Sequence, residues 1–494
     1  MARYITINGA DNVAVALDAL TKGEHVMVRD RAVVLAEDIP AGHKFAVEPI
    51  AKGDKVLKYG FAIGNAQSDI APGQWVHTHN VKTGLGDVLS YTYQPNLVPL
   101  PQRKPSTFNG YRRKDGQVGV RNEVWIVPTV GCVNSIADQL ARNAASYANE
   151  KQIDGVFSFP HPYGCSQMGD DQEYTQKILA GMVHHPNAGA VLILGLGCEN
   201  NNITEFRKVL GEVDGERVRY LECQATEDEF ADGQAILHEL IDYAAQFTRE
   251  PVDASELIVG LKCGGSDGLS GITANPLVGR FSDILVASGG TAILTEVPEM
   301  FGAETILMNR CRSEAVFDKT VRLINEFKDY YSRHNQVIYE NPSPGNKKGG
   351  ITTLEDKSLG CIQKGGTAEV TDVLDYGERT LTKGLNLLQG PGNDLVAATA
   401  LVASGAHIVL FTTGRGTPFG SPAPTVKISS NTALATQKRS WIDFNAGVLA
   451  EGADFDEVGE QFFDYIIEVA SGKQVRAEIN GCRDFAIFKS GVTL

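Results

Sequence analysis

The middle of the 494-residue chain alternates short apolar runs with longer segments in which apolar residues recur at helical spacing. The short runs predict buried strands, and the longer segments predict amphipathic helices. The expected strands lie near 124–130, 155–159, 190–194 and 217–222, and the expected helices between and after them cover 133–149, 171–185, 202–211 and 227–248. This alternation predicts an α/β domain with a parallel sheet over residues 108–250.

The two ends of the chain follow other patterns. Residues 1–97 contain short alternating segments between Gly, Pro and Asp turns, which predict a small β-rich module; only Asp11–Leu20 has helical spacing. The proline-rich stretch 98–107 is expected to be an extended linker. Residues 251–494 return to alternating strands and helices, which predicts a second parallel-sheet α/β domain. Long glycine-rich loops interrupt it at 341–366, 384–394 and 412–424, and loops of this length usually carry function.

The composition limits the class of protein. Hydrophobic residues make up 43% of the chain, and no apolar run approaches the length of a membrane span, so no membrane partner is expected. The formal net charge of −15 argues against nucleic acid, whose binders carry basic patches. Eight scattered cysteines and an N-terminus without a long apolar stretch predict reduced thiols in the cytoplasm. A small acidic ligand stays compatible, because a local Arg/Lys cluster can bind an anion.

Four cysteines follow predicted strands and lie beside or near glycine: Cys132, Cys165, Cys198 and Cys263. Ligands of parallel sheets bind at the carboxyl ends of the strands, so these thiols predict one shared site, either an iron centre or a pocket lined with soft metal ligands. The alternative is that each thiol is a small buried apolar group. The remaining cysteines, Cys223, Cys311, Cys361 and Cys482, are interpreted as structural. Glu296 and Glu299 follow the strand predicted at 291–295, where they suit either acid–base chemistry or loop capping.

A glycine-rich loop follows the strand predicted at 407–411. Its amides, hydroxyls and guanidinium predict a cradle for a carboxylate or phosphate, formed by Thr413, Gly414, Arg415 and Gly416. The loop 341–357, which contains Lys347, is rich in hydroxyls, amides and lysines and favours a polyhydroxylated ligand. The alternatives are a glycine turn with a surface arginine and a merely solvated loop.

Further polar side chains lie in predicted turns. A hairpin expected over 111–122, with Asp-Gly as its turn, carries Arg113, Arg121 and Asn122, which would line a pocket or else simply protect a sheet edge. His43 and Lys44 follow a glycine in a loop, and His161 precedes Cys165 by four residues. These three are the candidates for a catalytic base, because such groups accept protons near neutral pH when their surroundings are suitable.

Several long segments resemble the altronate/galactarate dehydratase family. They are 42–46, 111–113, 119–122, 163–165, 195–200, 263–267, 272–276, 342–350, 413–418 and 488–491, so the resemblance covers essentially the whole chain. It implies an N-terminal SAF (β-clip-like) module joined to a larger catalytic region. It also implies a requirement for ferrous iron or a similar divalent metal such as Mn²⁺. An iron–sulfur cluster is left as an alternative to a single metal ion.

The resemblance further implies a hydro-lyase of hexuronate (galacturonate) catabolism, which converts D-altronate to 2-dehydro-3-deoxy-D-gluconate. A Lewis-acidic metal would stabilise the enediolate, with its ligands drawn from Cys132, Cys165, Cys198, Cys263 and His43. Arg415 and its neighbouring amides would hold the substrate carboxylate, and the base would be His43, Lys44 or His161. A dehydratase of galactarate or another 2,3-dihydroxy acid, and a non-catalytic sugar-acid-binding protein, are the alternatives. The expected partners are a small sugar acid and, in a possible homodimer, a second copy of the chain.

Overall fold

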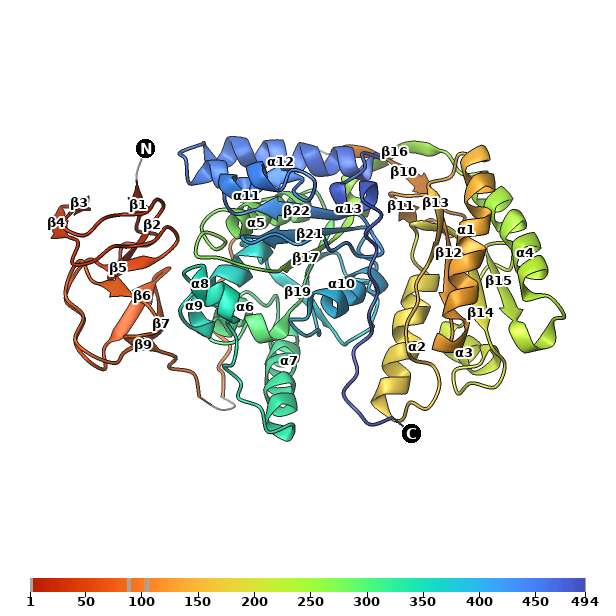
Figure 1. Cartoon of the computed structure of the whole chain (residues 1–494), viewed down its shortest axis with the longest axis horizontal. Helices are drawn as coiled ribbons and strands as arrows, with labels where there is room; N and C mark the ends of the chain where they lie inside the picture. The colour runs from red at the N-terminus through yellow and green to blue at the C-terminus, as the bar shows by residue number, and fades with distance from the viewer. Residues whose placement is uncertain (1–2, 87–89, 102, 104–105, 494) are drawn as a thin grey trace.

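The computed structural model describes residues 3–86, 90–101, 103 and 106–493. They form three domains in a row (Figure 1). The N-terminal β domain lies at one end, residues 254–493 form the central domain, and residues 107–253 form the second domain at the other end. Residues 102, 104 and 105 of the predicted linker lie outside the described residues. The α/β class with a small β-rich N-terminal domain is confirmed.

The N-terminal domain consists of short antiparallel strands. One sheet has the order β1 (Tyr4–Ile5), β2 (Val13–Ala16), β5 (Lys44–Ala46), β8 (Trp75–Val76), and the other strands are β3 (His25–Val28) with β4 (Arg31–Val34), and β6 (Lys55–Lys58), β7 (Phe61–Ala66), β9 (Val81–Lys82). The helix predicted over Asp11–Leu20 is wrong, because strand β2 occupies its centre. All four β2 side chains are buried, so the segment lacks the polar alternation that identifies a strand.

The second domain confirms the predicted alternation. Its parallel sheet has the order β13 (Gly155–Ser158), β12 (Glu123–Pro128), β14 (Ala188–Gly195), β15 (Val218–Glu222). Helices α1 (Asn134–Glu150) and α4 (Glu229–Ala244) cover one face, and α2 (Asp170–Val183) and α3 (Ile203–Leu210) cover the other. The predicted hairpin is present as β10 (Thr107–Arg112) and β11 (Val118–Gly119), and β16 (Arg249–Asp253) extends it to three strands.

The C-terminal domain contains a seven-stranded parallel sheet. Its order is β19 (Val370–Leu374), β20 (Gly384–Leu388), β18 (Thr291–Leu294), β17 (Ile258–Cys263), β21 (Ile408–Thr413), β22 (Thr425–Ser429), β23 (Phe444–Asn445). Its helices are α5 (Ala274–Ala287), α6 (Glu304–Met308), α7 (Glu314–Arg333), α8 (Pro344–Lys348), α9 (Leu354–Cys361), α10 (Asp394–Ala403), α11 (Thr432–Gln437), α12 (Phe455–Ala470) and α13 (Arg476–Ile479).

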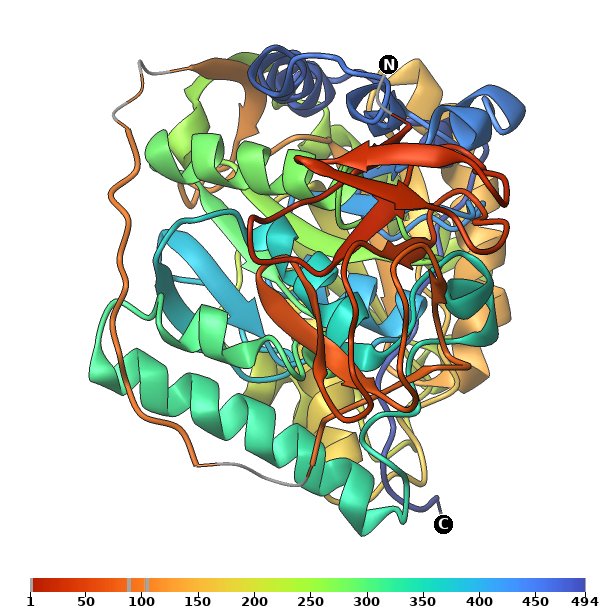
Figure 2. The ribbon, with the colours of Figure 1, turned by 90° about the vertical axis from the view of Figure 1, so that its left-hand side faces the viewer.

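Two contacts join the domains closely. Helix α10 packs against α2 of the second domain, where a Cβ at Gly181 would lie 2.3 Å from the carbonyl oxygen of Ala403. Only glycine fits at position 181, since any side chain would force α2 and α10 apart. At the other end, the N-terminal domain covers the part of the C-terminal domain that carries α8 and α9 (Figure 2).

Two predicted loops contain regular structure. The range 341–366 includes α8 and α9, and 384–394 begins with strand β20, so the prediction of long irregular loops there is wrong. All eight residues of α9 are buried, which removes the polar face by which a helix is recognised in sequence. All eight cysteines are free thiols. In the part of the chain that the structure describes, every helix is too short or too polar to cross a lipid bilayer.

Candidate active site

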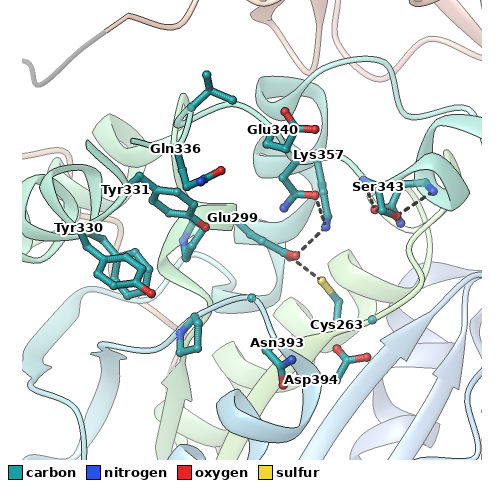
Figure 3. A pocket seen from close by; sticks show the side chains of 18 of the residues that line it. Cys263, Glu299, Tyr330, Tyr331, Gln336, Glu340, Ser343, Lys357, Asn393 and Asp394 are labelled. Carbon is teal, nitrogen blue, oxygen red and sulfur yellow. Dashed lines mark hydrogen bonds and ion pairs between the residues drawn. The ribbon is translucent and has the colours of Figure 1, made fainter. Parts of the chain in front are cut away.

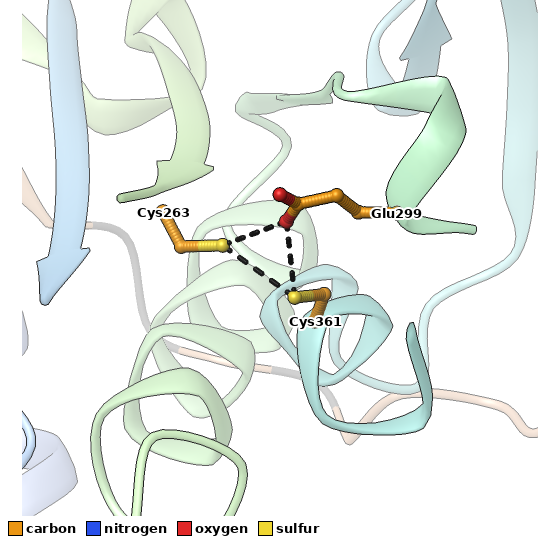
Figure 4. A group of neighbouring side chains, drawn as sticks. All are labelled: Cys263, Glu299 and Cys361. Carbon is orange, nitrogen blue, oxygen red and sulfur yellow. Dashed lines mark hydrogen bonds between the residues drawn. The ribbon is translucent and has the colours of Figure 1, made fainter. Parts of the chain in front are cut away.

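Three ligand-type side chains meet at the carboxyl edge of the large sheet (Figure 4). Cys263 ends β17, Glu299 follows β18, and Cys361 ends α9. The Glu299 Oε2 atom lies 3.0 Å from Cys263 Sγ and 3.1 Å from Cys361 Sγ, and the two sulfurs are 3.5 Å apart. All three residues are buried, and among the described residues they are the one set of three His, Cys, Asp or Glu side chains whose ligand atoms lie within 4.8 Å of one another. We call them the Cys263–Glu299–Cys361 group.

Buried lysines surround this group. Lys357 Nζ lies 2.7 Å from Glu299 Oε1, which leaves Oε2 directed at the sulfurs. Lys262 pairs with Glu296 at 3.0 Å and with Asp394 at 2.6 Å, and Lys364 lies 3.7 Å from Glu296. This concentration of positive charge stabilises anions that burial alone would neutralise.

The positive charge shifts the acidity of the group. The hydrogen bond with Cys361, assisted by the nearby lysines, lowers the pKa of Cys263 to about 6, although burial raises it. Burial also raises the pKa of Glu299, but Lys357 and Lys364 outweigh this effect and lower it to about 2. The same hydrogen bond and burial raise the pKa of Cys361 well above its usual value. The lysines therefore favour the anionic forms of Glu299 and Cys263, which are the forms that bind a cation.

A cavity of about 630 Å³ opens beside the group (Figure 3). Its base is formed by Cys263, Glu299, Lys357, Asn393 and Asp394, and its walls include Tyr330, Tyr331 and His334 from α7 and its end, together with Asn341, Ser343, Asn346 and Phe488. Amides, hydroxyls, a lysine and carboxylates thus line one open cavity. The cavity falls within the range of roughly 300–1,000 Å³ that is usual for small-molecule sites.

The donor set fits a divalent metal ion. Two sulfurs and one carboxylate oxygen already converge, and three protein ligands with an open position are typical of catalytic metal sites. Cys263 and Glu299 also line the cavity, so an ion held by the group would be accessible from it. Thiolate ligands favour Fe²⁺ over Mn²⁺, which prefers oxygen ligands.

The structure divides the four cysteines that the sequence predicts as one site. Cys263 lies in the Cys263–Glu299–Cys361 group, whereas Cys132, Cys165 and Cys198 are exposed on loops of the second domain. Cys361 was missed because it follows no strand and lies inside an apparent loop. A signal was present: Thr353 caps α9 by accepting a hydrogen bond from the Asp356 amide, and Lys357 and Cys361 are one helical turn apart.

The predicted carboxylate cradle borders a second cavity. This cavity of about 500 Å³ lies between the N-terminal and C-terminal domains, and Gly42, Asp267, Lys348, Gly414 and Arg415 line it. Thr413 Oγ1 accepts a hydrogen bond from the Gly416 amide and so fixes the turn. Lys347 lies on α8 between Asn346, which faces the first cavity, and Lys348, which faces the second. The loop 264–269 contributes Gly264 and Gly265 to the first cavity and Asp267 and Leu269 to the second.

The three predicted bases, His43, Lys44 and His161, form hydrogen bonds with other groups of the protein. Lys44 is fully buried; its Nζ donates to Gly350 O and Asp356 Oδ2, both at 2.8 Å, and burial lowers its pKa to about 8 although Asp356 raises it. His43 contacts Lys348 O through Nε2 and accepts from the Trp75 indole through Nδ1. His161 is buried, with Nε2 at 2.8 Å from Pro128 O and Nδ1 accepting from the Tyr163 amide, and burial lowers its pKa to about 4.

The hairpin residues bridge other parts of the chain. The Arg113 guanidinium donates to Pro186 O, Asn122 Oδ1 and Arg121 O, each at 2.8 Å, and borders a separate cavity of about 340 Å³. Arg121 pairs with Glu478 of the C-terminal domain at 2.7 Å. None of these three residues lines either of the two cavities described above.

Comparison with known proteins agrees with this architecture. Residues 2–84 match the altronate/galactarate dehydratase SAF domain, 110–245 match the D-galactarate dehydratase/altronate hydrolase second domain, and 254–493 match the D-galactarate/altronate dehydratase C-terminal domain. The chain is 56% identical to the altronate dehydratase of Escherichia coli K12 and 54% identical to that of Bacillus subtilis 168, each over the full length of both chains. The chain belongs to the D-galactarate/altronate dehydratase family.

Another member is more distant. The galactarate dehydratase (L-threo-forming) of Escherichia coli K12 is 34% identical over 96% of this chain and 94% of its own length. The predicted family is therefore confirmed, and with it the SAF domain and the assignment of the chain as a hydro-lyase. The Cys263–Glu299–Cys361 group lies within the matched C-terminal domain.

Proposed function

We propose that the chain dehydrates D-altronate to 2-dehydro-3-deoxy-D-gluconate in hexuronate (galacturonate) catabolism, and that the reaction takes place in the 630 Å³ cavity. The observation that carries this proposal is the Cys263–Glu299–Cys361 group opening onto a polar cavity. The substrate follows from the relatives that are 56% and 54% identical over their full length, both altronate dehydratases.

The reaction needs positive charge near the substrate carboxylate. Removing the proton at C2 places a second negative charge on a group that is already an anion, so fixed cations must stabilise it as it forms. Lys357 borders the cavity and stays cationic, because Glu299 and the two thiols raise its pKa overall although burial lowers it. Lys357 is therefore the residue that faces the developing charge. Asn341 and Asn393 line the cavity and, among the described residues, use only their Oδ1 atoms within the protein, so their amide N–H groups suit the sugar hydroxyls.

Proton transfer is assigned to Asp394. Its carboxylate borders the cavity, one oxygen is fixed by Lys262 at 2.6 Å, and its side chain remains one third exposed, so a substrate proton can reach it. Such a base contributes on the order of 10²–10⁴-fold. A ferrous ion held by Cys263, Glu299 and Cys361 would supply Lewis acidity toward a substrate oxygen.

The test is release of 2-keto acid from D-altronate by the purified chain, with galactarate and other 2,3-dihydroxy acids in parallel. We expect D-altronate to be the preferred substrate. Cys361→Ala should lower kcat by at least about 100-fold, with the loss of one metal equivalent per chain. Cys482→Ala is the matched control and should retain both. Full turnover by Cys361→Ala would contradict the proposed site, and preference for galactarate would contradict the proposed substrate.

A further inference from the structure

The second domain carries three exposed thiols at one edge of its sheet. Cys165, Cys132 and Cys198 follow β13, β12 and β14, which are neighbours in the sheet. Parallel strands end at the same edge, so the loops that carry these cysteines are adjacent. Five other cysteines in the chain are buried or half-buried. The proposed catalytic cavity uses none of the three exposed thiols.

Backbone contacts lock the three loops together. The Gly131 amide donates to Tyr163 O and the Asn201 amide donates to Gly164 O, both at 2.9 Å, and the Ser166 amide donates to Asn200 Oδ1 at 2.9 Å. A Cβ at Gly164 would lie 2.0 Å from Thr129 O, so these backbones approach as closely as glycine allows. Each cysteine is thus one to three residues from a bond to another cysteine loop, so the backbone that carries the three thiols is held in place.

The surroundings suit a negatively charged group. Cys132 lies in the short 3-10 turn Gly131–Val133 that leads into helix α1, whose N-terminus has no side-chain cap and whose first turn has no acidic residue. The positive end of the helix dipole therefore favours an anion beside Cys132. Gln224 Nε2 donates to Cys198 Sγ at 3.5 Å, which is the kind of hydrogen bond that tunes metal-bound sulfur.

The spacing of the sulfurs distinguishes the type of metal centre. Two sulfurs bound to one ion at about 2.3 Å cannot lie more than about 4.6 Å apart. Among the described residues, the sets of three ligand atoms within 4.8 Å of one another do not include these three cysteines. One ion therefore does not fit all three, whereas a cluster binds each thiolate through a different iron.

We propose that Cys132, Cys165 and Cys198 together bind an iron–sulfur cluster at the carboxyl edge of the second domain's sheet. Three thiolates serve three irons of a four-iron cluster, and the fourth iron is left to an oxygen ligand from solvent or a small oxyanion. Cys223 follows β15 at the same edge, but it packs against the apolar core under α1 and α4, and burial raises its pKa to about 11. It is therefore not a member of the set.

The C-terminal tail links this cluster site to the cavity. Phe488 borders the cavity, the Ser490 amide donates to Asp171, and Thr493 pairs with Gln167, two residues after Cys165. A cluster would therefore order the loop on which the end of the tail rests. This site is separate from the Cys263–Glu299–Cys361 group, so each can be tested without the other.

The test is anaerobic reconstitution of the full chain with ferrous iron, sulfide and thiol, followed by iron and sulfide analysis, visible absorption and electron paramagnetic resonance. We expect about four iron and four sulfide per chain with broad charge-transfer bands, in addition to the one iron assigned to the Cys263–Glu299–Cys361 group. Cys132→Ser, Cys165→Ser and Cys198→Ser should each lose the sulfide and the bands, whereas Cys482→Ser and Cys361→Ala should keep them. Circular dichroism identifies any variant that fails to fold. For such a variant, the substitute test compares cadmium binding by the wild-type chain with the three thiols free and with the three thiols alkylated.

Two results would overturn the inference. One is iron without sulfide in the wild-type chain. The other is a cluster that survives in any of the three serine variants. If Cys361→Ala loses altronate turnover but keeps the cluster, both the proposed function and the cluster are supported. If Cys361→Ala keeps that turnover, only the proposed function is contradicted.

Discussion

The attachment of the N-terminal domain depends on one buried carboxylate. Asp356 of α9 lies 2.8 Å from Lys44 Nζ and 3.0 Å from Lys58 Nζ, and the side chains of all three are at most 3% exposed. The substitution Asp356→Asn preserves shape but removes the negative charge. It leaves two buried ammonium groups without an anion, because no other carboxylate is bonded to either lysine in the described residues.

Breaking a buried ion pair on one side costs about 3–5 kcal/mol. This is a large part of a typical free energy of unfolding of about 5–15 kcal/mol. Lys44→Met should cost less than Asp356→Asn, because Lys58 still pairs with Asp356. The exposed pair Arg31–Glu48 provides the matched control, and Glu48→Gln should cost less than about 1 kcal/mol.

The assay is urea unfolding at pH 7, followed by circular dichroism, with limited proteolysis of the segment between the N-terminal and second domains. Asp356→Asn should unfold at lower urea and be cleaved faster. Its kcat should also fall, because α9 carries Lys357 and Cys361. The reasoning is refuted if Asp356→Asn costs less than about 1 kcal/mol, or if Lys44→Met costs as much.

Three further outcomes are expected. Asp394→Asn should lower kcat on D-altronate by about 100-fold or more without loss of bound iron, and unchanged kcat would exclude Asp394 as the base. The pKa of His161 is lowered from 6.5 to about 4, so the unfolded chain binds more protons between these values and stability should fall by about 3 kcal/mol as pH drops through this window. His161→Gln should remove that part of the pH dependence, measured by urea unfolding at several pH values. Gly181→Ala should lower stability by about 1–3 kcal/mol in the same assay, because its methyl group would meet Ala403 O; an unchanged midpoint would show that α2 and α10 can separate freely.

The second domain could be predicted almost element by element. Its helices α1 and α4 each have one apolar face toward the sheet and one polar face toward solvent, and its strands are continuous apolar runs. Both patterns are visible in sequence. Segments buried on every side lack such a pattern, and this is why β2 was expected to be a helix and α9 a loop.

The candidate site could be predicted only in part. Cys263 and Glu299 follow strands, and parallel topology places strand ends together, so sequence alone indicates them as candidates. Cys361 approaches them from a helix nearly 100 residues further along the chain, and only the packing of α9 between the N-terminal domain and the large sheet brings it there. The local sequence can indicate α9 through its Thr353 cap, but it does not indicate which strand ends Cys361 will meet.

The most direct measurement of the central claim is anomalous diffraction at the iron edge from crystals of the chain grown anaerobically with ferrous iron and soaked with D-altronate. The account predicts an iron peak between Cys263, Glu299 and Cys361, with altronate beside it in the 630 Å³ cavity and its carboxylate near Lys357. Altronate bound instead in the cavity lined by Arg415, with no iron at the Cys263–Glu299–Cys361 group, would contradict the account.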